Sequence, residues 1–144
     1  PYEGDIEFEK TTEIAKHLND LGCYEISLGD TLGYGTPLKV RSLINNIINF
    51  IELNKIAVHF HDTYGQALAN IFAALEIGVS NIDTSVGGLG GCPYAKGAKG
   101  NVATEDVIYM LDGMNIETNI DINEDPNPRA TKGSMSSLPV LSKP

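Results

Sequence analysis

The amino-acid sequence predicts an α/β fold with a parallel sheet, and three observations lead to this prediction. Segments with helical spacing of apolar residues alternate with short apolar segments that are typical of strands. Polar residues that could carry chemistry cluster directly after the predicted strands. The 144 residues are 42% hydrophobic and 20% charged, which fits one domain of ordinary composition.

The predicted elements follow one another in a regular order. A helix is expected at 8–21, where Gly22 provides a stop signal, and the first strand at 23–28. The sequence then predicts a helix at 38–53, a strand at 56–61, a helix at 64–77, a strand at 79–86 and a helix at 104–112. Strands separated by helices are joined by crossover connections, so the strands are expected to be parallel.

The number of strands suggests half of a barrel. Three parallel strands alone would leave two open sheet edges, and a complete (β/α)₈ barrel needs about 250 residues. From about residue 123 the chain holds four Pro and four Ser with little periodicity, which is typical of disorder. We therefore predict a partial barrel domain over 1–115 and a disordered tail over 116–144.

Composition excludes several classes of protein. Ten Lys and Arg against nineteen Asp and Glu give a net charge of −9, and without a basic stripe this argues against binding to nucleic acid. No apolar run is long enough to span a membrane, and the start resembles neither a signal nor a transit peptide. Only Cys23 and Cys92 are present, which favours a reducing compartment over a disulfide scaffold. A start at Pro1 rather than Met suggests a piece of something longer.

Two histidines end the second predicted strand. His59 and His61 stand at positions i and i+2, so a strand would direct both imidazoles to one face. Such a pair suits a divalent cation. Two hydrogen-bonded histidines with a structural role fit the same pattern, and the spacing alone leaves both readings open.

A glycine-rich loop covers 87–101 and contains Cys92. Glycines let a backbone approach a ligand closely, and the loop leads toward a helix that could cradle phosphate, although it lacks the Gly-Lys-Ser/Thr ending of a P-loop. An exposed thiol near a metal or a lysine could be acidified and transfer protons. An incidental loop cysteine is the alternative. Asp30, after the first strand, is a further candidate at the same edge.

Three segments resemble the 3-hydroxy-3-methylglutaryl-CoA lyase family, within the metal-dependent lyase and aldolase barrels. They are CYEISLGDTLGYGTP at 23–37, VHFHDTYGQALAN at 58–70 and SVGGLGGCPYAKGAKGNVATEDVIYML at 85–111. The last is very close to that family's signature loop. The resemblance covers most of 1–115 and implies that the three strands are strands six, seven and eight, so that the chain is the C-terminal half of a (β/α)₈ barrel.

The resemblance also implies roles for individual residues. His59 and His61 match the family's two histidine metal ligands, and Asn101 matches the asparagine that completes the ligand set from this half. Cys92 matches the catalytic cysteine of the loop, and Asp30 matches an acidic residue of the active site. The implied reaction is the cleavage of hydroxymethylglutaryl-CoA to acetyl-CoA and acetoacetate with Mg²⁺ or Mn²⁺, in leucine catabolism and ketone body formation. Members are mitochondrial in eukaryotes and cytoplasmic in bacteria.

The departures from the family open a second hypothesis. The family's first strand supplies an aspartate ligand and an arginine that polarises the substrate, and its next strand supplies a glutamate; these segments do not occur in this sequence. The first hypothesis is therefore a carbon–carbon lyase. The second is a catalytically incomplete fragment or partner module, which pairs with a second copy or a complementing N-terminal barrel half. A related enzyme acting on another acyl-CoA is a third.

Overall fold

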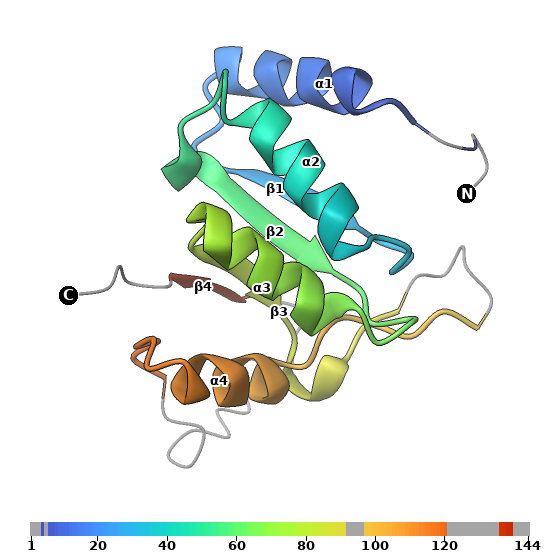
Figure 1. Cartoon of the computed structure of the whole chain (residues 1–144), viewed down its shortest axis with the longest axis vertical. Helices are drawn as coiled ribbons and strands as arrows, with labels where there is room; N and C mark the ends of the chain where they lie inside the picture. The colour runs from blue at the N-terminus through green and yellow to red at the C-terminus, as the bar shows by residue number, and fades with distance from the viewer. Residues whose placement is uncertain (1–3, 5, 92–96, 121–135, 140–144) are drawn as a thin grey trace.

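The structure, a computed structural model, describes residues 4, 6–91, 97–120 and 136–139 and contains one four-stranded sheet. The strands lie in the order β1-β2-β3-β4; the first three are parallel and β4 is antiparallel to β3. Figure 1 shows α2 and α3 in front of the strands, with α1 at the top and α4 at the bottom. The elements are α1 (Phe8–Asp20), β1 (Ile26–Asp30), α2 (Pro37–Ile47), η1 (Leu53–Lys55), β2 (Ile56–Phe60), α3 (Ala67–Ile77), β3 (Asn81–Thr84), η2 (Val86–Gly88), α4 (Thr104–Gly113) and β4 (Ser136–Pro139).

Alternation along β2 divides the sheet into two faces. Ile56, Val58 and Phe60 are buried in the core that the strands share with the helices. Because successive strand residues point to opposite faces, the His59 side chain lies on the other face of the sheet. The helices contribute Val40, Ile44, Ile47, Ala67, Ile71, Ala74, Val107, Ile108 and Leu111 to the same core.

The register of the strands aligns their polar ends. Gly29 of β1 pairs with His59 of β2, which pairs in turn with Asp83 of β3. Paired residues of neighbouring parallel strands direct their side chains to the same face, so these three positions form one row across the sheet. The row lies near the carboxyl ends of the strands, where the sequence predicted functional residues.

Helix α2 is shorter than predicted, and an asparagine gives the reason. The apolar stripe predicted a helix to residue 53, but α2 ends at Ile47. The Asn49 side-chain nitrogen donates to the backbone oxygens of Asn45 and Asn46, at 2.9 and 3.2 Å. Such side-chain bonds satisfy the last carbonyls of a helix and compete with its continuation.

The region after residue 115 departs in part from the expected tail. Ile116 packs against the core and Thr118 is buried, so the folded part extends beyond the predicted boundary. Ser136–Pro139 forms β4, whose backbone pairs with the otherwise open edge of β3. Residues 121–135 and 140–144 lie outside the described residues, so the predicted disorder there stays a prediction. In the described part of the chain, no helix has the length and apolar character needed to cross a membrane.

Candidate active site

His59 and His61 lie side by side at the end of β2. Their ring centroids are 5.3 Å apart with the ring planes inclined by 50°. His61 follows the last residue of β2, and its backbone nitrogen donates to the carbonyl oxygen of Asp30 at 3.2 Å. The prediction that the i, i+2 spacing places both imidazoles together is therefore confirmed.

Asn101 returns to this edge from the far end of the glycine-rich loop. It forms an antiparallel bridge with His61, and the flanking backbone bonds join Asp62 to Gly100 at 3.0 Å and Val102 to Phe60 at 3.1 Å. The chain therefore places Asn101 beside the histidines although forty positions separate it from His61. The spacing of the residues gave no indication of this contact, and only the resemblance pointed to Asn101.

In the described residues, Thr63 Oγ1 and Asn70 Oδ1 are buried without a hydrogen-bond partner, and so are three polar atoms of the residues at this edge. These three are Nδ1 of His59, Nδ1 of His61 and Oδ1 of Asn101. Leaving such an atom unsatisfied costs about 1–3 kcal/mol, so three together indicate a site shaped for something that accepts lone pairs. No three His, Cys, Asp or Glu side chains of the described residues group as a metal site. The residues present thus fit a divalent cation only with an oxygen donor such as the Asn101 amide.

Asp83 is a neighbour of His59 to which the sequence assigned no role. Its Oδ2 lies 3.8 Å from Nδ1 of His59, too far for a hydrogen bond, and accepts a hydrogen bond from Ser27 Oγ at 2.7 Å. Ser27, His59 and Asp83 come from three adjacent strands. The alternation of polar residues on each strand was readable, but the register that aligns them was not.

The surroundings of His59 lower its pKa. Burial is the largest cause because it disfavours the charged imidazolium, and the neighbouring His61 acts in the same direction. The carboxylates of Asp83 and Asp30 oppose this shift without reversing it. His59 is therefore neutral at pH 7, with a lone pair available for a cation or a proton.

The Asp30 carboxylate does not hydrogen-bond to the histidines or Asn101. Asp30 pairs with Phe60 in the register, so its side chain lies on the helix-facing side of the sheet. There its oxygens accept the backbone N–H groups of Gly35 at 2.7 Å and Tyr34 at 3.1 Å. It also lines a cavity of about 330 Å³ with apolar residues of α1 and α2. The structure thus shows Asp30 organising the loop after β1, and its predicted part in the active site stays a prediction.

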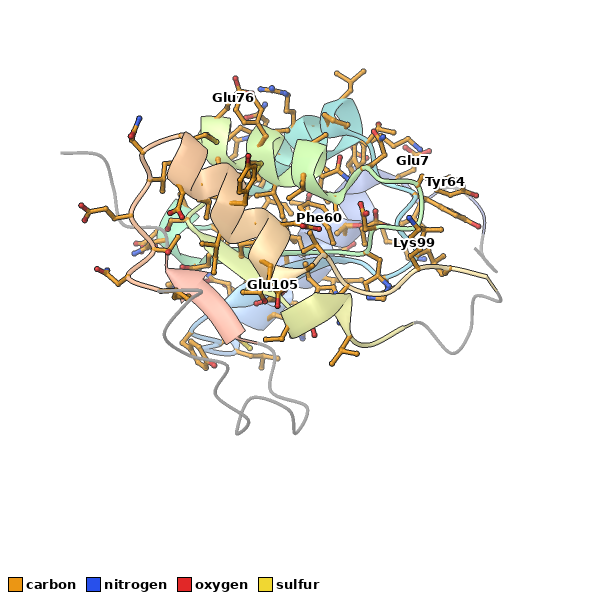
Figure 2. All side chains as sticks on the ribbon, turned by 90° about the horizontal axis from the view of Figure 1, so that it is seen from below. Glu7, Phe60, Tyr64, Glu76, Lys99 and Glu105 are labelled. Atoms are coloured by element: carbon orange, nitrogen blue, oxygen red, sulfur yellow. The ribbon has the colours of Figure 1, made fainter. Side chains whose placement is uncertain are left out.

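The ends of the glycine-rich loop lie against each other next to the site. Gly90 accepts the backbone N–H of Asn101 at 3.0 Å, and the Glu105 carboxylate at the start of α4 accepts the N–H of Gly87. Figure 2 shows Glu105 beside the segment that contains η2. Cys92 lies outside the described residues, so its predicted role stays a prediction.

These features define a class of protein: part of a (β/α) barrel with a histidine and amide site at the carboxyl ends of its strands, where barrel enzymes carry their chemistry. The chain belongs to the HMGL-like family, which matches residues 1–126 and whose members generally depend on a divalent metal. Relatives that it matches are named as lyases.

Individual relatives agree with this assignment. Cytoplasmic 3-hydroxy-3-methylglutaryl-CoA lyase of Rattus norvegicus is 56% identical over 86% of this chain and 36% of its own length. Mitochondrial hydroxymethylglutaryl-CoA lyase of Arabidopsis thaliana is 55% identical over 86% of this chain and 26% of its own length. The crystal structure of hydroxymethylglutaryl-CoA lyase from Pseudomonas aeruginosa superimposes with a TM-score of 0.82 and 53% identity, over 85% of this chain and 41% of that chain. The predicted partial barrel is confirmed, and the chain spans about a third of the length of the curated relatives it matches.

Proposed function

We propose that this chain carries the histidine and amide part of a hydroxymethylglutaryl-CoA lyase active site, which cleaves 3-hydroxy-3-methylglutaryl-CoA to acetyl-CoA and acetoacetate. The observation that carries the proposal is that His59, His61 and Asn101, which are neighbours at this edge, each have a buried polar atom without a hydrogen-bond partner. The names of the cytoplasmic and mitochondrial relatives support the choice of substrate. We expect the protein in one of these two compartments.

The donor set suits Mg²⁺ or Mn²⁺. Two imidazole nitrogens and an amide oxygen leave room for further oxygen ligands, which both ions prefer over a closed tetrahedral site. When bound, such an ion supplies a Lewis acid that stabilises negative charge on substrate oxygens. The lowered pKa of His59 keeps its imidazole unprotonated for this purpose, and the negative charge of Asp83 near its Nδ1 atom favours a cation there.

The reaction moves one proton off the substrate and one onto a product. The tertiary hydroxyl loses its proton, the carbon–carbon bond breaks to leave a ketone, and the enolate of the acetyl thioester gains a proton. We assign proton transfer to Cys92 on the glycine-rich loop, by its resemblance to the family's catalytic cysteine. Asp30 is proposed to act at the same edge, and its charge already reaches His59.

A second candidate function, a partner module, is favoured by the surface around α1. In the described part of the chain no strand pairs with β1 on the side away from β2. Ile14, Leu18 and Leu21, at i, i+4 and i+7 of one face, are 56%, 38% and 70% exposed. A complementing N-terminal barrel half would cover both features and supply the aspartate and arginine that the family uses.

One assay tests both candidates. Turnover of 3-hydroxy-3-methylglutaryl-CoA with Mn²⁺ is measured for the full chain alone and mixed with the N-terminal half of a related lyase. We expect turnover in the mixture, its loss in His61→Ala, and no change in Asn45→Ala on the exposed surface of α2. Turnover by the chain alone would exclude the need for a partner. A mixture that assembles and binds Mn²⁺ without turnover would contradict the proposed lyase.

A further inference from the structure

The two polar atoms of the Asn101 side-chain amide are in different situations: Nδ2 is hydrogen-bonded to the loop, and Oδ1 has no partner. We propose that Asn101 couples a divalent cation at its Oδ1 atom to the conformation of the loop stem, defined here as Val86–Gly90 and Gly100–Asn101, through its Nδ2 atom. This inference rests on the cation site of the proposed function. It adds that the same side chain senses the cation and positions the base of the glycine-rich loop.

A hydrogen bond defines the orientation of the Asn101 amide. Asn101 Nδ2 donates to the carbonyl oxygen of Leu89 at 2.9 Å. A carbonyl can only accept, so the nitrogen has to face Leu89 and the oxygen has to face away from it. That oxygen is buried and has no hydrogen-bond partner. The Nδ2 atom of the amide is therefore hydrogen-bonded to the loop stem, whereas its Oδ1 atom, which faces away from Leu89, has no partner.

The loop stem packs closely around Asn101. A methyl group at Gly90 would lie 2.8 Å from Nδ2 of Asn101, and one at Gly88 would lie 3.0 Å from its backbone oxygen. At Gly100 an added methyl group would lie 2.0 Å from the oxygen of Gly90. Gly88 and Gly90 also have positive φ angles, of 66° and 99°, which only glycine adopts readily. A displacement of the Asn101 amide is thus transmitted directly to Gly88–Gly90.

Backbone hydrogen bonds hold Asn101 next to His61. Its bridge to His61 and the backbone bonds of Gly100 and Val102 to β2 and its continuation tie it to the strand. A cation at Oδ1 polarises the amide and makes its N–H groups stronger donors, which strengthens the bond to Leu89. Cation binding should therefore stabilise the loop stem in the conformation described here. The equilibrium of cation binding and the conformational equilibrium of the stem are then linked.

The test separates the two ends of the amide. Asn101→Asp keeps oxygen ligands for a cation but replaces the nitrogen that donates to Leu89. Mn²⁺ binding by the full chain is measured by titration calorimetry, and hydrogen exchange of segments 86–91 and 97–103 by mass spectrometry. In the wild type, Mn²⁺ is expected to slow exchange in both segments at least threefold. In Asn101→Asp, Mn²⁺ is expected to bind within about tenfold of the wild-type affinity, but without slowing exchange there.

A control variant and a second measurement keep the inference falsifiable. Asn45→Asp makes the same charge change at an exposed position of α2 and is expected to behave like the wild type. If Asn101→Asp does not fold, hydrogen exchange of the wild type alone tests the inference. The coupling then requires that Mn²⁺ slows exchange in the loop stem but not at the end of α3. Mn²⁺ binding without slowing in the stem would overturn the coupling and leave the proposed function intact. Absence of Mn²⁺ binding by the wild type, both alone and mixed with the N-terminal half of a related lyase, would overturn both.

Discussion

His59 and Asp83 occupy directly paired positions on β2 and β3, and Asp83 Oδ2 lies 3.8 Å from His59 Nδ1. The same carboxylate oxygen accepts the hydroxyl of Ser27, so the aspartate is held from the far side of β2. The carboxylate thus lies beside the same His59 nitrogen that is buried without a hydrogen-bond partner, and its negative charge favours a cation there. The pair therefore links the sheet register to the chemistry of the candidate site.

Asp83→Asn removes this charge with little change in shape. Because that charge favours a cation at the neighbouring nitrogen, we expect the dissociation constant for Mn²⁺ to rise about tenfold. Ser27→Ala, which only releases the carboxylate, is expected to cost less. Titration calorimetry measures both, with circular dichroism to verify folding. Unchanged Mn²⁺ affinity in a folded Asp83→Asn protein would rule out a contribution of the Asp83 charge.

The lowered pKa of His59 predicts how stability depends on pH. Below about pH 6.5 an unfolded histidine takes up a proton, whereas folded His59 stays neutral to lower pH. The unfolded state then binds more protons, so the free energy of unfolding should fall as the pH drops from 6.5 through the folded pKa. Urea titrations at pH 7.5 and 5.5 measure the change.

His59→Gln provides the comparison for this effect. The variant lacks the titrating group, so its urea midpoint is expected to change less between the two pH values. Identical pH dependence in His59→Gln and the wild type would assign the effect to other groups.

Gly35 is expected to tolerate no side chain. A methyl group there would lie 2.7 Å from Asp30 Oδ2 and 3.4 Å from Asn70 Nδ2, and these two side chains also bond the Gly35 peptide from both ends. Gly35→Ala should therefore destabilise the chain by about 1–3 kcal/mol, as overpacking typically does. Gly113→Ala, where nothing lies within 4 Å, should be neutral or slightly stabilising. Chemical denaturation compares the two variants. Equal stabilities would show that Asp30 and Asn70 do not restrict the space at Gly35.

Cys92→Ala separates cation binding from turnover. If the thiol transfers a proton, its loss should abolish turnover in the assembly that is active, while Mn²⁺ affinity stays within about twofold. His61→Ala should remove both, because a ligand is lost. Steady-state assays and calorimetry on the same preparations give the two readouts. Full activity of Cys92→Ala would show that another group handles the proton.

Much of the fold was predictable from local patterns. The predicted end of a helix at residue 77 is confirmed, because Gly78 adopts a φ of 106° as the cap of α3 and donates to the carbonyls of Ala74 and Leu75. The spacing of His59 and His61 fixed their common face. The end of α2 was mispredicted, since the capping bonds of Asn49 compete with an apolar stripe that continues to Ile51.

The sequence by itself determined the order of the helices and of the three parallel strands, and the common face of the two histidines, because these follow from spacings of two to four residues. The tertiary structure decided which distant residues join them. Asp83 reaches His59 through the register of β2 and β3, Asn101 reaches His61 through the closure of a glycine-rich loop, and Asp30 pairs with Phe60 on the opposite face. Register and loop closure depend on how separate segments pack together, and no local spacing encodes that packing.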